Sequence, residues 1–361
     1  MKKSIFMVAL AALAMTSCSQ DEVLEVKKDA MSFSAFTENA SRATAVQTGS
    51  LGDFIVYANE NGTGTPYIKG VTATKDNSLP GEGNFRLAQT YYWPENSLDF
   101  YCIYPADVDG LTPTSNVPSV VDYACVNDGT DYHAEDLLYS VSLDTEKGAN
   151  GIAQINFRHA LAMIDFKAVS LVDYALDVTI NSVTIKNISN TATYSLGDCE
   201  GTDSQVTTTT DVDANYRGKW SGWNAASESY LFNFAGVEMA FEEDATEDLE
   251  ENLNTEPYFI MPQELTADET KAQPEEGKSY FVINCEVTKN DVVVNSGDVF
   301  IPVSGEWKEG YKYTYTFIFG KGAGYENDLV TPVIVPISFN CTVDEFIADP
   351  IDVDMEAVVA P

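Results

Sequence analysis

The chain has 361 residues, and its 56 Asp and Glu residues outnumber its 20 Lys and Arg residues to give a formal net charge of −36. Nucleic-acid binding depends largely on basic side chains that displace counterions from phosphates, so this charge excludes nucleic acid as a partner. The six cysteines occur without any C-x-x-C spacing, which gives no support for a zinc knuckle or a thioredoxin-type site.

The first residues have the pattern of an export signal. Lys2 and Lys3 are followed by an apolar run from Ile5 to Met15 and by small residues before Cys18. This order is that of a secretory signal peptide, and the run is too short to span a bilayer. We therefore expect residues 1–17 to be a lipoprotein signal peptide and Cys18 to be acylated. An ordinary secreted protein with a chance cysteine is the alternative.

Residues 18–42 contain one short alternation, in which Met31, Phe33 and Ala35 share a phase. Alternate side chains of a strand lie on opposite faces, so this segment is predicted to hold a strand that follows a tether to the anchor. A disordered tether without a strand is the alternative.

Alternation with a period of two dominates the rest of the chain. It is clearest at residues 311–319, where aromatic residues occupy every second position. Residues 333–343 repeat the pattern, but Pro332 and Pro336 cannot donate to a ladder, which predicts an edge strand. Further strands are predicted over Phe54–Ala58, Leu98–Tyr104, Ile155–Phe166, Val178–Ile188, Phe281–Val287 and Val299–Val303, the third with a bulge between Met163 and Ile164.

Turns rich in Gly, Asn, Asp and Pro separate these segments, and long helices are not evident. Many short strands in a chain of this length predict an all-β fold with two tandem β-sandwich domains. The expected organisation is an N-terminal sandwich over 43–170, a C-terminal sandwich over 171–348 and a tail over 349–361.

The sequence lacks the patterns typical of catalytic and metal sites. His133 and His159 lack metal-ligand spacing, and His159 is in phase with apolar neighbours, as a core or domain-interface histidine would be. Cys102, Cys285 and Cys341 also alternate with apolar residues and are interpreted as small core residues. There is no G-x-S-x-G, P-loop or dinucleotide fingerprint, so we assign no catalytic residue, metal or cofactor and do not expect an enzyme.

Two tryptophans offer an alternative function. Trp220 and Trp223 lie in a Gly-rich segment, 217–224, that could form an exposed loop. Exposed aromatic rings can stack on sugars, so the alternative is a non-polymerising, carbohydrate-binding surface lipoprotein. Packing of the rings in the core is the competing interpretation.

Several segments, taken in order, resemble the fimbrillin family of Bacteroidetes pilins and fimbrillin-like surface lipoproteins. None is diagnostic alone, and the resemblance rests on their succession over nearly the whole chain. After the lipobox-like Thr16-Ser17-Cys18, the similar segments are Met31–Ala35, Ser41–Ala43, Tyr92–Pro94, Phe100–Pro105, Phe157–Ala162 and Trp307–Phe319.

This resemblance implies two transthyretin-like Greek-key sandwiches and a structural or adhesive subunit of a surface fimbria. It also implies export as a lipoprotein to the outer membrane and cleavage by an arginine-specific protease after Arg42, with Ala43 as the new N-terminus. Release of the first strand would open a groove that a strand of another subunit fills by β-augmentation. The expected partners are therefore other fimbrial subunits, together with a host or bacterial surface glycan or protein.

The same resemblance places the donor strand in the C-terminal tail. Acidic residues interrupt its apolar residues, so a tail that packs on its own domain is the alternative, and both interpretations stand. The apolar residues of the candidate donor strand are Ile351, Val353, Met355, Val358 and Val359.

Overall fold

The described residues of the computed structural model are strands joined by loops, with a short 3-10 helix at Val172–Tyr174. The predicted all-β fold is therefore confirmed, whereas the tandem Greek-key arrangement stays a prediction. Within the described ranges, no helix is long and apolar enough to cross a membrane. These ranges are residues 30–37, 51–78, 84–112, 117–127, 132–148, 151–196, 218–267, 275, 277–326, 332–345 and 355–356.

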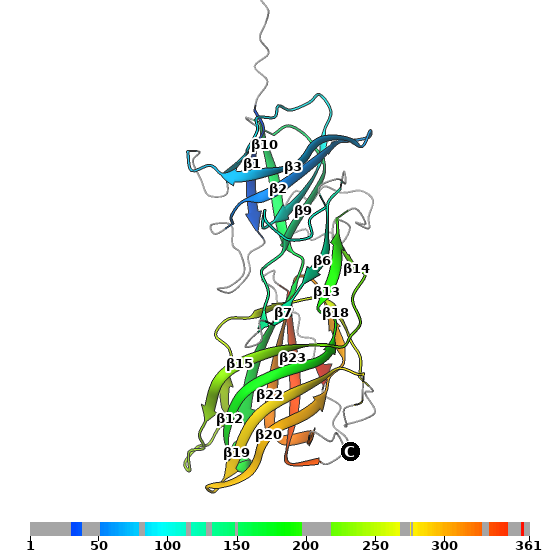
Figure 1. Cartoon of the computed structure of the whole chain (residues 1–361). Helices are drawn as coiled ribbons and strands as arrows, with labels where there is room; N and C mark the ends of the chain where they lie inside the picture. The colour runs from blue at the N-terminus through cyan, green and yellow to red at the C-terminus, as the bar shows by residue number, and fades with distance from the viewer. Residues whose placement is uncertain are drawn as a thin grey trace, which may run out of the picture.

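The N-terminal half of the chain forms a closed sheet in the order β1-β10-β9-β5-β2-β3-β4, which we call the N-terminal barrel (Figure 1). The sheet closes because β1 pairs in parallel with β10 and antiparallel with β4. Its strands are β1 (Ser32–Thr37), β2 (Phe54–Glu60), β3 (Thr65–Lys75), β4 (Asn84–Leu87), β5 (Leu98–Tyr104), β9 (Leu138–Thr145) and β10 (Ile152–His159).

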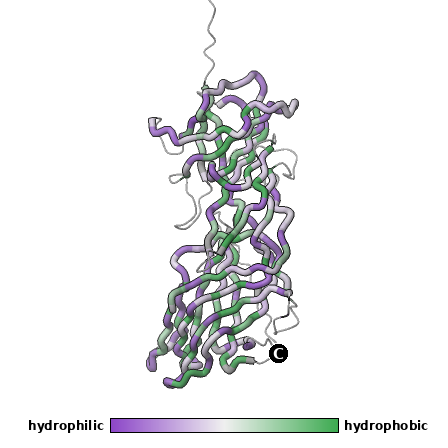
Figure 2. The backbone as a smooth tube through the Cα atoms, in the orientation of Figure 1, coloured by the Kyte–Doolittle hydropathy of each residue, from purple (hydrophilic) through white to green (hydrophobic). Residues whose placement is uncertain are grey.

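Aromatic side chains fill the N-terminal barrel. The ring centroid of Phe54 lies 4.9 Å from that of Phe85, 5.0 Å from Phe157 and 6.3 Å from Phe33, all edge to face. These four side chains are fully buried. Edge-to-face pairs of this kind add about 0.5–1.5 kcal/mol each to the stabilisation that burial provides. Hydrophobic stretches run along the strands in Figure 2, and hydrophilic residues gather at the turns.

The second half forms a larger sheet in the order β15-β12-β19-β20-β22-β11-β16, which we call the C-terminal sheet. Strand β17 (Tyr258–Ile260) also pairs with β11, and β23 (Pro332–Glu345) lies between β22 and β24 (Met355–Glu356). The other strands are β11 (Ala162–Ser170), β12 (Asp177–Ile188), β15 (Glu228–Met239), β16 (Leu249–Asn252), β19 (Tyr280–Lys289), β20 (Val292–Pro302) and β22 (Tyr311–Tyr325).

An aromatic core lies beneath the C-terminal sheet. The alternation predicted at residues 311–319 is confirmed, because its last four aromatic side chains are buried. Phe281 of β19 lies 4.9 Å from Tyr315 and 5.3 Å from Phe317 between ring centroids. The ring centroid of Phe339 in β23 lies 5.5 Å from that of Phe281. Three strands that are distant in sequence are thereby packed together.

The single strand predicted over residues 155–166 is wrong. The chain instead forms two strands, β10 in the N-terminal barrel and β11 in the C-terminal sheet. The change of sheet therefore comes before β11, within the segment expected to belong to the N-terminal domain up to residue 170. Periodicity missed this break because every residue from 157 to 164 is buried, so no exposed position marks the turn.

Hydrogen bonds from the C-terminal half hold the turn between β10 and β11. The indole Nε1 of Trp220 donates to the carbonyl of Ala160 at 2.7 Å, and the N–H of Gly310 donates to the carbonyl of Leu161 at 2.9 Å. Both carbonyls are removed from the strand ladder, so these donors satisfy buried acceptors that would otherwise cost free energy.

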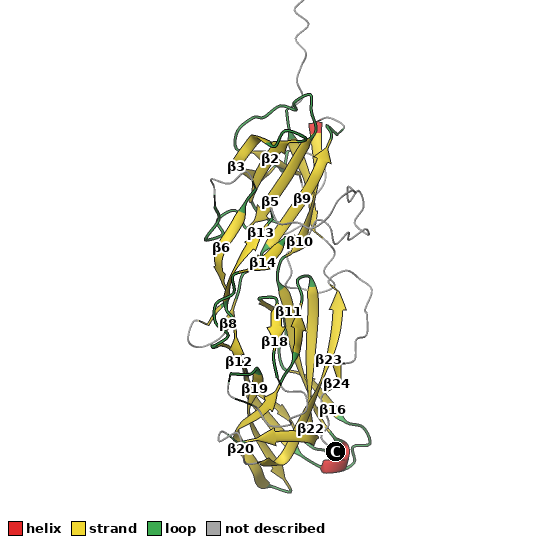
Figure 3. Ribbon diagram, turned by 90° about the vertical axis from the view of Figure 1, so that its right-hand side faces the viewer, coloured by secondary structure: helices red, strands yellow, loops and turns green. Residues whose placement is uncertain are grey.

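A small sheet at the junction, β14-β13-β6, adds a second connection between the two halves (Figure 3). Close by, the Glu309 carboxylate accepts hydrogen bonds from the hydroxyls of Tyr139 in the N-terminal barrel, at 3.4 Å, and Tyr194 in β13, at 3.2 Å. The remaining strands are β6 (Ser119–Ala124), β7 (Val126–Asn127), β8 (Tyr132–His133), β13 (Thr191–Ser195), β14 (Lys219–Ser221), β18 (Gln263–Leu265) and β21 (Gly305–Trp307).

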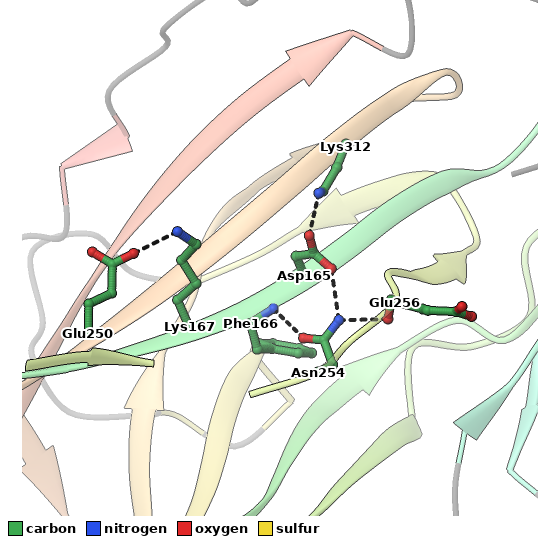
Figure 4. Close-up of polar contacts among 7 residues, drawn as sticks. All are labelled: Asp165, Phe166, Lys167, Glu250, Asn254, Glu256 and Lys312. Atoms are coloured by element: carbon green, nitrogen blue, oxygen red, sulfur yellow. Dashed lines mark hydrogen bonds and ion pairs between the residues drawn. The ribbon is translucent and has the colours of Figure 1, made fainter. Parts of the chain in front are cut away.

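A polar network joins β11 to its neighbours (Figure 4). Asp165 forms an ion pair with Lys312 of β22 and accepts a hydrogen bond from the side-chain amide of Asn254 at 2.8 Å. The amide oxygen of Asn254 accepts the main-chain N–H of Phe166 at 2.8 Å. Asn254 thus takes the place of a strand partner where β11 passes from its pairing with β17 to its pairing with β16.

The buried cysteines give a pH-dependent prediction. Burial raises the pKa of the Cys125 thiol from 9.0 to about 11. Between these pH values the unfolded chain loses a proton that the native state keeps, so the native state loses stability as pH rises above 9. We expect the free energy of unfolding, relative to that of Cys125→Ala, to fall by about 1.4 kcal/mol per pH unit in this interval.

Urea unfolding under reducing conditions measures this effect. The difference in free energy between the two proteins should be constant from pH 6 to pH 8 and smaller at pH 10. A difference that stayed the same at pH 10 would show that Cys125 ionises equally in both states.

Candidate strand-exchange site

The strand that completes the N-terminal barrel, β1, is also the first strand among the residues that the structure describes. β1 forms six successive residue pairs with β10 and three with β4. Just before it, the N–H of Met31 donates to the carbonyl of Tyr91 at 2.8 Å. β1 is therefore inserted between two strands that both come later in the sequence.

The side chains of β1 and of the residue before it alternate between core and surface. Met31, Phe33 and Ala35 are buried, with exposed fractions of 4%, 0% and 1%. Ser32 and Ser34 on the opposite face are half-buried. Burying Met31 and Phe33 contributes about 1.5–3 kcal/mol each, before conformational entropy is subtracted. The structure thus places an inward-facing apolar strand at the alternation noted in the sequence.

Without β1, the edges of β10 and β4 would face each other across an open groove. The backbone groups that pair with β1 would lose their partners, and the walls of the groove would be apolar. Phe54 and Phe100, whose ring centroids lie 6.3 and 5.7 Å from that of Phe33, would line its floor. An open edge above exposed core residues is a template for the addition of another strand.

One wall of this groove was missed in the sequence. β4 spans four residues, and Phe85 and Leu87 are its two buried side chains. Two apolar residues after a Gly-rich turn are too short a pattern to separate a strand from a loop. The alternation of these two residues is the signal that was present.

Most of the other residues assigned from the sequence lie outside the described residues. Met355 is described by its backbone: with Glu356 it forms β24, which pairs with Cys341 and Asn340 of β23. β24 thus belongs to the C-terminal sheet, whereas β1 belongs to the barrel at the other end of the molecule (Figures 1 and 3). The assigned residues outside the described ranges are Cys18, Arg42, Ala43, Ile351, Val353, Val358 and Val359.

The two candidate sugar-stacking tryptophans are not exposed together. Trp220 is 6% exposed and packs on Tyr194, with ring centroids 4.9 Å apart. Trp223 is 43% exposed and donates its indole N–H to the carbonyl of Pro262 at 3.0 Å. Trp220 is therefore a core residue. The two tryptophans do not form the exposed stacking surface that was considered for segment 217–224.

The histidine in the Phe157–Ala162 segment is a core residue. His159 is 2% exposed, its Nδ1 lies 3.0 Å from Oδ1 of Asp136, and its ring stacks on Phe259. Phe259 belongs to the C-terminal sheet, so His159 lies at the contact between the two halves. Among the residues the structure describes, no group of three or more His, Cys, Asp or Glu side chains could hold a metal ion.

The described residues form two β-sheet bodies, the first of them completed by β1, and this arrangement defines an all-β class of protein. A fimbrillin-like family model matches residues 41–344. The chain therefore belongs to the fimbrillin-like family, as its sequence resemblance indicated. As a member of this family, it is a fimbrial or adhesion subunit.

Several solved structures are similar to this chain. A candidate cell adhesion protein from Bacteroides uniformis has 15% identity and a TM-score of 0.47, with 89% of this chain and 99% of that chain covered. A second, from Bacteroides ovatus, has 14% identity and a TM-score of 0.45, with 89% and 98% covered. The C-terminally truncated tip fimbrial protein Mfa3 from Porphyromonas gingivalis has 11% identity and a TM-score of 0.36, with 86% and 99% covered. No curated protein matches the sequence.

Proposed function

We propose that this chain is a structural or adhesive subunit that assembles by donor-strand exchange after proteolysis. In this proposal it is exported as a lipoprotein and anchored in the outer membrane through Cys18. An arginine-specific protease cuts between Arg42 and Ala43 and releases β1. The observation that supports the proposal is the position of β1, which fills an apolar groove between β10 and β4 and ends at Thr37, before Arg42 in the sequence.

The arrangement of the two ends of the chain supports exchange between subunits. The tail residues of β24 lie along β23, while the groove filled by β1 lies in the other half of the molecule (Figures 1 and 3). A tail that fills this groove therefore comes from a second copy. Such a head-to-tail contact generates a filament when the rotation between successive copies does not close a ring.

The sequence of the tail is compatible with a strand that has one buried and one solvent-exposed face. Ile351, Val353, Met355 and Val359 share one phase, as the buried residues 31, 33 and 35 do at β1. Asp352, Asp354 and Glu356 fall in the other phase together with Val358, where β1 has half-buried serines, whereas Asp349 shares the phase of Ile351. In a donor strand, the charges of Asp352, Asp354 and Glu356 would then stay in contact with water, so they would not have to be buried.

Two variants test the proposal. Arg42→Ala should give a folded, lipid-bound monomer that is not cut, because the protease recognises the arginine. Deletion of residues 351–361 should permit cleavage and block chain growth. Electron microscopy of cells, with N-terminal sequencing of the surface protein, reads both steps, and Lys28→Ala serves as a control that keeps the cleavage site.

Filaments formed by Arg42→Ala would contradict proteolytic activation. Filaments formed by the tail deletion would contradict the donor assignment. The Lys28→Ala control must assemble as much filament as the unaltered protein. Only then can a loss of filaments in the other variants be assigned to Arg42 or to the tail.

A further inference from the structure

A cavity of about 560 Å³ lies on the C-terminal half, between β15 and the segment that leads into β17. Its volume is within the range of small-molecule sites in proteins, about 300–1,000 Å³. Neither the groove of β1 nor Trp223 contributes to it. Its walls come from residues 233–235 and 253–259, together with Tyr132 and Ala134.

One wall is a strand whose backbone is irregular where it meets the cavity. Ala235 has a φ of 56°, followed by Gly236 with a φ of 78°, and the register between β12 and β15 shifts at this point. A left-handed alanine is uncommon and costs free energy, and such residues gather at ligand sites. The bulge interrupts β15 beside Asn233 and Phe234, which also line the cavity.

The other wall is a loop that leaves the sheet between two strands. β16 and β17 both pair with β11, and residues 253–257 connect them, with Leu253 buried and Thr255 and Glu256 exposed. Asn254 holds this loop: besides its bonds to Asp165 and Phe166, its amide donates to the carbonyl of Glu256 at 2.7 Å (Figure 4). Asp165 is itself fixed by Lys312. The loop is therefore preorganised, which lowers the entropic cost of binding a ligand.

The chemistry of the lining favours a polar, uncharged ligand with apolar faces. The half-buried Tyr258 supplies aromatic surface and the edge of Phe234, which is 8% exposed, adds to it, while the exposed Asn233, Thr255 and Glu256 supply an amide, a hydroxyl and a carboxylate. Aromatic rings pack on the C–H faces of sugar rings, and the polar groups match sugar hydroxyls as donors and acceptors. None of the described residues that line the cavity is Lys or Arg, and the net charge of −36 repels anions.

We propose that this cavity is a binding site for a neutral saccharide. The site lies away from the strand-exchange groove and does not depend on it. A subunit would therefore bind the sugar both before and after assembly.

The test uses the full-length Arg42→Ala protein, which keeps the chain uncleaved. It is applied to an array of neutral oligosaccharides built from hexoses and N-acetylhexosamines, with sialylated and sulfated glycans and a lysine-rich peptide beside them. We expect binding to at least one neutral glycan and none to the anionic ones. Titration calorimetry then measures the Kd of the best ligand.

Three variants locate the site. Thr255→Trp places a large ring from the exposed loop into the cavity, and Glu256→Gln removes an exposed carboxylate, so neither disturbs a buried contact of its own side chain. We expect Thr255→Trp to raise the Kd at least tenfold and Glu256→Gln to raise it severalfold. The matched control is Trp223→Ala, which removes the exposed ring outside the cavity and should leave the Kd unchanged.

Several results would overturn the proposal: no neutral glycan bound, binding confined to anionic glycans or to the basic peptide, or an unchanged Kd in Thr255→Trp. A loss of binding in Trp223→Ala alone would move the site to that tryptophan. Because every variant is measured as a monomer, failure here leaves strand exchange untouched, and failure to assemble leaves the sugar site untouched.

Discussion

Phe33→Ala should lower the free energy of unfolding of the uncleaved Arg42→Ala protein by about 3–5 kcal/mol, the usual range for truncating a buried Phe. Phe33 is fully buried, and its ring contacts Phe54 and Phe100 edge to face. Its truncation leaves a cavity in the centre of the N-terminal barrel. Because β1 is paired with a strand on each side, the barrel cannot easily collapse into this cavity. Urea unfolding followed by tryptophan fluorescence measures the change.

Ser34→Ala is the matched control for Phe33→Ala. Its side chain lies on the other face of β1 and is half-buried, so a change within about 0.5 kcal/mol is expected.

The same pair of variants also tests replacement of β1. On the cleavable chain, Phe33→Ala should not change the stability of the assembled filament, because β1 is no longer part of it. A filament weakened by Phe33→Ala would mean that β1 stays in place.

Lys312→Met should cost about 3 kcal/mol of stability, toward the low end of what breaking a buried ion pair costs. The side chains of Lys312 and Asp165 are 13% and 20% exposed, so removal of the lysine leaves a largely buried carboxylate without its counter-charge. The same carboxylate holds Asn254, and through it the loop between β16 and β17. Urea unfolding at pH 7 gives the free energy.

Two comparisons isolate the ion pair. Lys308→Met breaks the pair between Lys308 and Glu306, whose side chains are 57% and 59% exposed, and should change stability by less than about 0.5 kcal/mol. Adding Asp165→Asn to Lys312→Met should recover most of the loss, because it removes the uncompensated charge and keeps an oxygen for Asn254. Equal effects of Lys312→Met and Lys308→Met would mean that Asp165 is well solvated.

Alternation predicted several strands in which one face is more buried than the other. β5, β12, β19 and β22 were found because their buried and exposed positions differ in side-chain chemistry over many residues. The passage from β10 to β11 was missed because its residues are buried on all sides. Short strands such as β4 and β14 offer too few positions for a period to show.

The order of strands in each sheet lies beyond what alternation can show. A period of two shows that Phe33 and Ala35 lie on the buried face of their strand, but it does not show which strands flank that strand. The pairing of β1 with β10 and β4 depends on contacts between segments far apart in the chain. The cavity beside β15 was missed for the same reason, since its two walls come from separate strands.

The closure of the N-terminal barrel by β1 has a kinetic consequence for when exchange can begin. Residues 38–53 join β1 to β2 in one chain. A strand tethered over such a distance competes for its own groove at an effective concentration on the order of millimolar. A tail from another subunit at lower concentration rarely displaces it. Under the proposed mechanism, a single cut after Arg42 removes this advantage, so one hydrolysed peptide bond sets the time at which free subunits begin to compete.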